Sequence, residues 1–329
     1  MNYISVIGAG SWGTTLANLL AEKGLEVTLW AYEKELVEEI GRTGMNGIYL
    51  PGLTLSPNLS ATNDIEHALK KAEIILNTVP TQFTRSVFRE AVRFIPGSAG
   101  LISACKGIEH GTLKTVSSIL EELTGKEAAV LSGPSFAEEV IKRLPTAVTI
   151  AARDEQRALL LQDLFNTDYF RIYTNTDVLG VELGGALKNV MAIASGISDG
   201  LGLGASTRAA LITRGLAEMT RLGVAMGAHE KTFGGLSGLG DLVLTCTGTL
   251  SRNYTVGSRL GKGEKLADIL SHMKMVAEGI ATSKSAYELA KKHDVEMPIV
   301  EQIYKVVYED REPVEAVKKL MARSLKSEN

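Results

Sequence analysis

Two motifs that lie far apart in the sequence have residue types that suit anion binding. The first is the glycine-rich run Gly8-Ala9-Gly10-Ser11-Trp12-Gly13, and the second is Ser251-Arg252-Asn253. A Gly-x-Gly-x-x-Gly turn brings backbone amides close to a pyrophosphate. An arginine beside the free amides of a helix start suits a phosphate. The two motifs therefore predict one site for a dinucleotide and another for a smaller phosphorylated molecule.

The glycine motif has the sequence context that gives it meaning. It follows an apolar run at residues 3–7 that predicts a strand, and it leads into helical spacing at residues 14–23. In this arrangement Gly8 permits a tight turn, Gly10 lets the backbone approach the pyrophosphate, and Gly13 allows close helix packing. The alternative is a glycine-rich turn that binds no nucleotide.

The residues after the second predicted strand leave the choice of cofactor open. An acidic residue at the end of this strand holds the ribose hydroxyls of NAD in many dinucleotide sites. Here the strand at residues 26–31 runs into Ala31-Tyr32-Glu33-Lys34. Glu33 would bind the ribose hydroxyls of NAD, whereas Lys34 would bind the 2′-phosphate of NADP. No acid stands at the strand tip itself, so we expect both NADH and NADPH to be used.

Lys188 has the residue type and the surroundings that suit proton transfer. It lies within Gly184-Gly185-Ala186-Leu187-Lys188-Asn189-Val190-Met191-Ala192, a segment that is otherwise apolar enough to be buried. A buried lysine near a carbonyl can protonate the developing alkoxide if its pKa moves toward neutrality. Asp241, in the turn Gly238-Leu239-Gly240-Asp241, is a candidate partner that would orient this lysine. The alternative is a structural lysine that extends its amine to the surface.

Two other polar segments have both a structural and a ligand-binding interpretation. Gly133-Pro134-Ser135-Phe136-Ala137-Glu138 follows a predicted strand, and Ser135 and Glu138 have the spacing of a capping box. The same loop is expected at the carboxyl edge of the sheet, where α/β proteins bind ligands. Ser251 is likewise the expected N-cap of a helix that ends at Gly261.

The first half of the chain alternates apolar runs with amphipathic segments. The apolar runs predict strands at residues 3–7, 26–31, 74–79, 100–104, 128–132, 147–152 and 170–173. Helical spacing predicts helices at residues 14–23, 64–71, 81–94, 112–123 and 136–143. This alternation predicts an α/β fold with an N-terminal Rossmann-like, doubly wound, mainly parallel sheet. After Asp177 the strand signals fade, so we place an NAD(P)-binding domain at residues 1–177 and an all-α substrate-binding and catalytic domain at residues 178–329.

Composition argues against several other classes of protein. Hydrophobic residues at 45% and charged residues at 22% are ordinary for a soluble globular protein, and a net charge of -3 disfavours nucleic-acid and anionic-membrane surfaces. Cys105 and Cys246 stand far apart and the five histidines lack metal-ligand spacing, so we expect no disulfide framework and no metal. The first strand begins almost at Met1, and charged residues interrupt the longest apolar stretch at 179–216. We therefore expect a cytoplasmic protein without membrane insertion.

Five segments, in order along essentially the full length, resemble the bacterial-type NAD(P)-dependent glycerol-3-phosphate dehydrogenases. These are Gly8-Ala9-Gly10-Ser11-Trp12-Gly13, Leu131-Ser132-Gly133-Pro134-Ser135-Phe136-Ala137, Leu187-Lys188-Asn189, Gly235-Leu236-Ser237-Gly238-Leu239-Gly240-Asp241-Leu242 and Ser251-Arg252-Asn253. The related 6-phosphogluconate and hydroxyisobutyrate dehydrogenases have Lys-x-x-x-Asn instead. In this chain Ala192 fills the last place of that pattern.

The resemblance implies reversible hydride transfer between NAD(P)H and dihydroxyacetone phosphate, which gives sn-glycerol 3-phosphate for glycerophospholipid synthesis. It implies that Lys188 is the general acid/base, and that substrate contacts come from Lys106, Gly133, Ser135, Lys188, Asp241, Ser251, Arg252 and Asn253. The implied cofactor-binding residues are Gly8, Gly10, Ser11, Trp12, Gly13, Tyr32, Lys106, Ala137, Arg252, Val276 and Glu278. Tyr32 replaces a basic or imidazole residue that is common there, which weakens the expectation of 2′-phosphate recognition. A homodimer is implied by the resemblance only.

Two other functions stay open at this point. One is a related enzyme that acts on a non-phosphorylated hydroxy acid, which phosphate-dependent turnover would exclude. The other is a catalytically idle, nucleotide-binding redox sensor. A buried lysine at position 188 argues against an idle protein.

Overall fold

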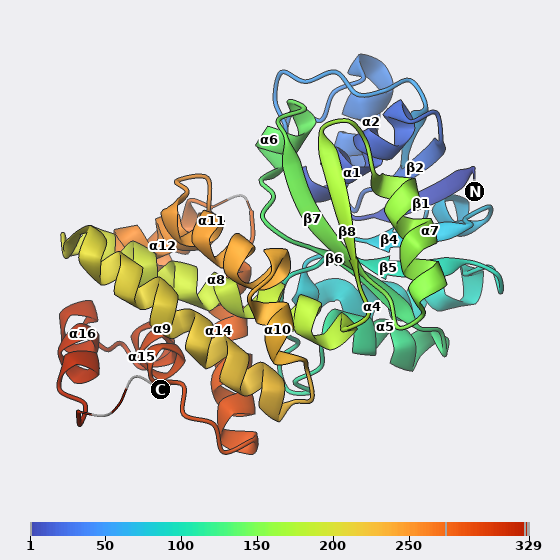
Figure 1. Ribbon diagram of the computed structural model, residues 1–329. Coiled ribbons are helices and arrows are strands. Elements are labelled where there is room, and N and C mark those ends of the chain that lie inside the picture. Colours follow the sequence, from blue (N-terminus) through green and yellow to red (C-terminus); the bar gives the residue numbers. More distant parts are fainter. Residues whose placement is uncertain (1, 274, 326, 328–329) are drawn as a thin grey trace. The chain divides into compact units, whose positions relative to one another are not determined.

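Two compact units make up the chain, and the computed structural model describes residues 2–273, 275–325 and 327 (Figure 1). The sheet unit comprises Met1–Gly107 and Lys114–Glu182, and the helical unit comprises Ile108–Leu113 and Leu183–Asn329. The predicted boundary between residues 177 and 178 coincides with the first residue of helix α8 (Val178–Gly200), whereas the two units divide inside that helix. Domain limits at 1–177 and 178–329 therefore stay a prediction.

The sheet unit contains an eight-stranded sheet in the order β3-β2-β1-β4-β5-β6-β7-β8. The β6–β7 pair is antiparallel and the other neighbouring strands are parallel, which confirms the predicted doubly wound, mainly parallel sheet. The strands are β1 (Tyr3–Ile7), β2 (Glu26–Trp30), β3 (Leu59–Thr62), β4 (Ile74–Asn77), β5 (Gly100–Ser103), β6 (Ala128–Ser132), β7 (Thr146–Ala151) and β8 (Phe170–Asn175). Strand β3 was not predicted, because it is short and its single large apolar residue, Leu59, is too weak a strand signal.

Helices cover both faces of the sheet, and each face has its own hydrophobic cluster. Ile4 and Val6 of β1 pack in one cluster with Leu16 of α1, while Ile7 packs in the other with Phe88 of α4. Burial on both faces explains why the strands appear as continuous apolar runs. The first face carries α1 (Ser11–Glu22), α2 (Lys34–Thr43), α6 (Ala137–Ile141) and α7 (Glu155–Phe165). The second carries α3 (Ile65–Leu69), α4 (Thr81–Ala91), the 3-10 turn η1 (Val92–Phe94) and α5 (Val116–Thr124).

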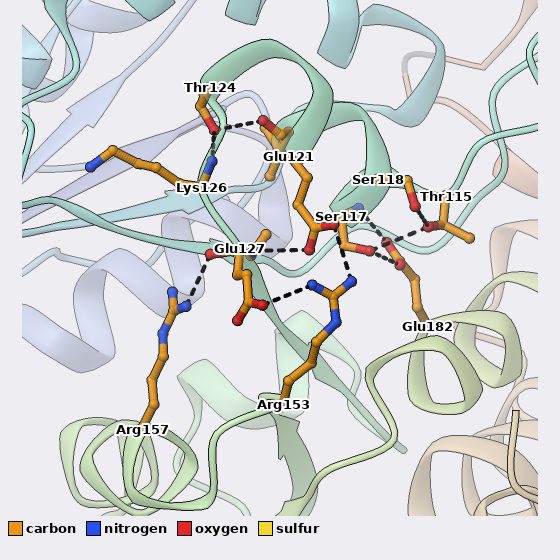
Figure 2. A network of polar contacts seen from close by, with 12 residues as sticks. Thr115, Ser117, Ser118, Glu121, Thr124, Lys126, Glu127, Arg153, Arg157 and Glu182 are labelled. Atoms are coloured by element: carbon orange, nitrogen blue, oxygen red, sulfur yellow. Dashed lines mark hydrogen bonds and ion pairs between the residues drawn. The ribbon is translucent and has the colours of Figure 1, made fainter.

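A buried carboxylate joins the start of α8 to α5. The Glu182 carboxylate accepts hydrogen bonds from Ser117 N at 2.8 Å and from Ser117 Oγ at 2.5 Å (Figure 2). Ser117 lies in the first turn of α5, where amides lack intrahelical partners and attract negative charge. Burial nevertheless raises the pKa of Glu182. In the same view Arg153 pairs with Glu121 and Glu127, each at 3.1 Å; such exposed pairs contribute little.

The helical unit has helices and turns and no strand among its described residues, as predicted. After α8 come α9 (Gly204–Ala225), α10 (Glu230–Phe233), the π-helical turn η2 (Leu236–Gly240), α11 (Asp241–Thr247), α12 (Arg252–Gly261), α13 (Leu266–Ser271), α14 (Glu278–Lys292), α15 (Pro298–Tyr308) and α16 (Pro313–Met321). By length and composition α8 is apolar enough to cross a membrane, but 94% of its most apolar window is buried inside the protein. A core helix has this property.

Glu218 of α9 holds the start of α15. Its carboxylate accepts hydrogen bonds from Ile299 N at 2.8 Å and from Val300 N at 3.2 Å. Burial raises the pKa of Glu218 from 4.5 to about 7, and these amide bonds, with Arg221 and Arg323, offset only part of that effect. The pKa of Glu218 is higher in the folded protein than in the unfolded chain, so between pH 4.5 and about pH 7 the folded protein binds more protons than the unfolded chain does. The free energy of unfolding therefore decreases as the pH rises toward and through 7.

Replacing Glu218 with glutamine is expected to remove this pH dependence. The unfolding free energy of the wild type should fall relative to that of Glu218→Gln by about 2 to 3 kcal/mol between pH 5 and pH 8. Urea denaturation of both proteins at the two pH values measures the change. Glu230→Gln, at an exposed position at the start of α10, is the control for loss of a carboxylate. A wild-type and Glu218→Gln difference that stays constant with pH would contradict the expectation.

Candidate functional site

The three glycines of the turn between β1 and α1 have three different structural roles. Gly8 has a φ of 114°, a left-handed conformation that favours glycine. A Cβ added to Gly13 would lie 1.9 Å from Gly8 O, so only glycine lets α1 start this close to β1. A Cβ added to Gly10 would meet no atom within 4 Å. The backbone at Gly10 is thus open to a ligand, as a pyrophosphate requires.

Trp12 gives a second, independent indication that this turn holds a ligand. Its indole Nε1 is buried and has no hydrogen-bond partner within residues 2–273, 275–325 and 327. An indole N–H only donates, and a buried donor without an acceptor is costly. A bound molecule with acceptor oxygens would satisfy it, so the residues present fit a dinucleotide. Tyr32, another residue predicted to bind the cofactor, is 82% exposed.

The loop between α2 and β3 packs on the glycine turn, which the sequence did not predict. Asn46 is fully buried and donates from Nδ2 to Ala9 O at 3.0 Å and to Thr14 Oγ1 at 2.8 Å. Ser11 Oγ donates to Tyr49 O at 3.0 Å. These contacts join residues more than thirty positions apart in sequence, and no local pattern marks them. They fix the shape of the turn before any ligand arrives.

Lys106, which follows β5, and Ser135, which follows β6, donate hydrogen bonds to the same carbonyl oxygen. Lys106 Nζ donates to Gly133 O at 2.9 Å, and Ser135 Oγ donates to the same oxygen at 3.0 Å. The predicted capping box is wrong. Helix α6 begins at Ala137 with Phe136 as its N-cap, and no side chain caps it, because the Ser135 hydroxyl is directed to Gly133 instead.

In the helical unit Lys188 lies against the partner expected for it. Its Nζ is 2.8 Å from Asp241 Oδ1 and 2.6 Å from Thr245 Oγ1, and lysine and aspartate are 6% and 1% exposed. The predicted Lys188–Asp241 pair is therefore confirmed as a contact. Thr245 was missed, although it lies four residues after Asp241 on the same side of α11. The arrangement holds one ammonium group in a fixed position inside the protein.

The residue after Lys188 belongs to a second polar group. Asn253 Nδ2 donates to Asn189 Oδ1 at 2.9 Å, and Gly279 N donates to Asn253 Oδ1 at 2.9 Å. Arg252 directs one guanidinium nitrogen to Val276 O at 3.0 Å. Ser251 is the N-cap of α12, as predicted, since its hydroxyl accepts from Tyr254 N. The start of α12, the start of α14 and the middle of α8 thus converge.

Glycines on both helices allow α8 and α12 to approach this closely. Gly196 and Gly200 lie on α8, and Gly257 and Gly261 lie on α12. A Cβ on any of them would fall between 2.1 and 2.5 Å from a carbonyl oxygen of the other helix; for Gly257 that oxygen belongs to Ile193. Real Cβ atoms do not approach so closely, so the contact depends on glycine at each of these places.

The predicted site residues fall into two groups, one in each unit. Within the sheet unit lie Gly8, Gly10, Ser11, Trp12, Gly13, Tyr32, Lys106, Gly133, Ser135 and Ala137. Within the helical unit lie Lys188, Asp241, Ser251, Arg252, Asn253, Val276 and Glu278, the last being the first residue of α14. Across the described part of the chain no group of three or more histidine, cysteine or acidic side chains has a geometry for a metal ion. Both cysteines are buried free thiols.

Comparisons with known proteins agree over the whole chain. Models of the N-terminus and the C-terminus of NAD-dependent glycerol-3-phosphate dehydrogenase match residues 3–158 and 177–318. The chain is 59% identical to a glycerol-3-phosphate dehydrogenase (NAD(P)+) of Citrifermentans bemidjiense, with 99% of this chain and 98% of the relative covered. The Geobacter sulfurreducens protein of the same name is 57% identical, with 99% and 98% covered. A crystal structure of glycerol-3-phosphate dehydrogenase from Coxiella burnetii superposes with a TM-score of 0.95 at 40% identity, with 98% and 99% covered.

Proposed function

Because the chain belongs to the NAD-dependent glycerol-3-phosphate dehydrogenase family, we propose that it reduces dihydroxyacetone phosphate to sn-glycerol 3-phosphate, reversibly, with NADH or NADPH. The observation in this chain that best supports the proposal is the buried contact of Lys188 with Asp241 and Thr245. A buried lysine needs a partner, and the position of this one is fixed beside a group of phosphate-binding residue types.

The residues of the sheet unit hold and orient the cofactor. The open backbone at Gly10 and the buried Trp12 Nε1 suit the pyrophosphate region, and Gly8 and Gly13 keep the turn closed beneath it. When bound, the reduced nicotinamide supplies the hydride that adds to the carbonyl carbon of the substrate.

Lys188 moves the proton of the same reaction. As the carbonyl becomes an alkoxide, the Lys188 ammonium gives one proton to its oxygen, and in the oxidation direction the neutral amine takes it back. Asp241 Oδ1 accepts a hydrogen bond from the amine and orients it, and Thr245 Oγ1 accepts a second hydrogen bond from Nζ. Their contacts hold the lysine in one rotamer, so the proton is delivered from a fixed position.

The first turn of α12 supplies the phosphate site. Arg252 and Asn253 lie beside backbone amides that have no helical acceptor, which is a favourable place for an anion. Binding energy from this remote phosphate would hold the reacting carbonyl in place.

We also propose that the product supplies glycerophospholipid synthesis, that the protein is a homodimer and that it works in the cytoplasm.

A spectrophotometric assay tests the proposed reaction. Oxidation of NADH and of NADPH is followed with dihydroxyacetone phosphate, with unphosphorylated dihydroxyacetone and with a non-phosphorylated 2-oxo acid. Turnover that depends on the phosphate is the expected result. Turnover of the 2-oxo acid alone would favour the related hydroxy-acid enzyme, and cofactor binding without turnover of any carbonyl substrate would favour the redox sensor.

Replacing Arg252 with lysine is expected to reduce kcat/KM for dihydroxyacetone phosphate by about tenfold or more, because an ammonium lacks the bidentate fork that matches a phosphate. The loss for unphosphorylated dihydroxyacetone should be much smaller, so the two substrates converge in efficiency. Steady-state rates of both substrates with both proteins measure this. An equal proportional loss on each would show that Arg252 acts through the cofactor or the fold, and Lys106 would become the next candidate for the phosphate.

A further inference from the structure

Tyr49 holds the carboxylate of Glu33 at the edge of the sheet. Glu33 follows β2 and is the N-cap residue of α2, yet its carboxylate makes no capping bond. Tyr49 OH instead donates to Glu33 Oε1 at 2.7 Å. Among the residues that the structure describes, Tyr49 is the one hydrogen-bond or ion-pair partner that this carboxylate has. The carboxylate is therefore positioned and still has acceptor capacity for a ligand.

The position of Tyr49 is itself set by the glycine turn. Its carbonyl accepts from Ser11 Oγ at 3.0 Å, and its amide donates to Asn46 Oδ1 at 3.1 Å. Asn46 in turn donates to Ala9 O. Burial and the neighbouring Glu33 carboxylate raise the pKa of Tyr49 to about 12, so its hydroxyl keeps the proton that it donates. Tyr49 is thus a rigid link from the turn to Glu33.

Strand pairing places Glu33 where the adenosine half of a dinucleotide goes. Ile7 at the end of β1 pairs with Trp30 at the end of β2, and Gly8 N donates to Trp30 O at 3.0 Å. The glycine turn and the segment with Glu33 therefore leave the same edge of the sheet from neighbouring strands. A dinucleotide whose pyrophosphate lies on the turn extends its adenosine ribose toward the end of the second strand.

We propose that Glu33 accepts hydrogen bonds from the adenosine ribose hydroxyls and that Tyr49 positions it, so that the chain prefers NAD(H) to NADP(H). This inference rests on the proposed function. A carboxylate accepts from the two neighbouring hydroxyls of an unmodified ribose, whereas a 2′-phosphate in the same place meets a like charge. Lys34, the competing candidate, is an exposed residue of the first turn of α2 and would favour NADP(H).

Dissociation constants test the proposal without reliance on turnover. NADH and NADPH are titrated onto the full chain by fluorescence of the reduced nicotinamide. The wild type is expected to bind NADH about tenfold more tightly than NADPH, and Glu33→Gln, which keeps the shape but removes the charge, should make the two constants nearly equal. Tyr49→Phe should weaken NADH about threefold to tenfold and leave NADPH almost unchanged.

Two further variants on the same helix complete the test. Glu35→Gln removes another exposed carboxylate of the first turn of α2 and is expected to leave the NADH/NADPH ratio as in the wild type. Tighter binding of NADPH to the wild type, with its loss in Lys34→Gln, would overturn the proposal, and so would an unchanged ratio in Glu33→Gln. Binding of neither cofactor to the wild type would instead refute the proposed dinucleotide site itself.

Discussion

Replacing Lys188 with alanine is expected to lower kcat for dihydroxyacetone phosphate by about a hundredfold or more, since one well-placed general acid contributes at least that factor. NADH binding should change by less than about twofold, because Lys188 is proposed to transfer a proton to the substrate and is not among the residues expected to bind the cofactor. Steady-state kinetics beside a fluorescence titration of NADH measures both. Residual activity near that of the wild type would remove Lys188 from the mechanism.

The same substitution removes the ammonium partner of the buried Asp241 carboxylate, which by itself costs about 3 to 5 kcal/mol. A double variant, Lys188→Met with Asp241→Asn, separates chemistry from folding because it removes both charges and keeps similar volumes. We expect this variant to unfold at a urea concentration closer to that of the wild type and to remain inactive. Recovery of activity in the double variant would mean that Lys188→Ala acts through stability.

Much of the fold could be predicted because the sheet is covered on both faces. Strands such as β1 and β4 are buried on each side, so they appear in the sequence as uninterrupted apolar runs. Strand β3 and helix α2 were missed for different reasons. Strand β3 lies at the edge of the sheet and contains the polar residues Ser60 and Thr62, so its apolar pattern is weak. Helix α2 does have an apolar stripe, Leu36 and Ile40, which indicates a helix, but the prediction did not use it.

Contacts within the candidate site could be predicted where an unusual residue stands in an apolar setting. Lys188 met that description, and its contact with Asp241 followed from the need to pair a buried charge. Tyr49 and Asn46 could not be found in this way, since they act through contacts that only the folded chain brings together. The Ser135 capping box failed for a related reason. Spacing shows which local bond is available, but not which acceptor competes for the hydroxyl.

The spacing of four glycines in α8 and α12 also indicates a feature of the structure that was not predicted. Gly196 and Gly200 have a spacing of four residues, and so have Gly257 and Gly261, which places each pair on one side of its helix. Glycine inside a helix is unfavourable, so two such pairs indicate a close backbone contact. The structure shows that contact between α8 and α12, beside Asn189 and Asn253.

Replacing Gly257 with alanine is therefore expected to lower kcat/KM for dihydroxyacetone phosphate by about a hundredfold, although residue 257 touches no reacting atom. The new Cβ would lie 2.1 Å from Ile193 O, and its other nearest atoms also belong to the Ile193 backbone, so no flexible side chain can yield. Helix α12 must move away from α8, which separates Asn253 from Asn189 and displaces Arg252. Overpacking of this kind should also destabilise the protein by about 3 kcal/mol.

Gly41→Ala is the matched control for this prediction. Gly41 also lies inside a helix, α2, but a Cβ there would meet no atom within 4 Å. The substitution should leave kcat/KM unchanged and stabilise the protein by about 0.5 to 1 kcal/mol, because alanine is the better helix former. Urea denaturation and steady-state rates of the two variants give the comparison. If Gly257→Ala behaved like Gly41→Ala, close packing of α8 and α12 would not be what positions Arg252 and Asn253, and hydrogen bonds such as Asn253 to Asn189 would have to hold them unaided.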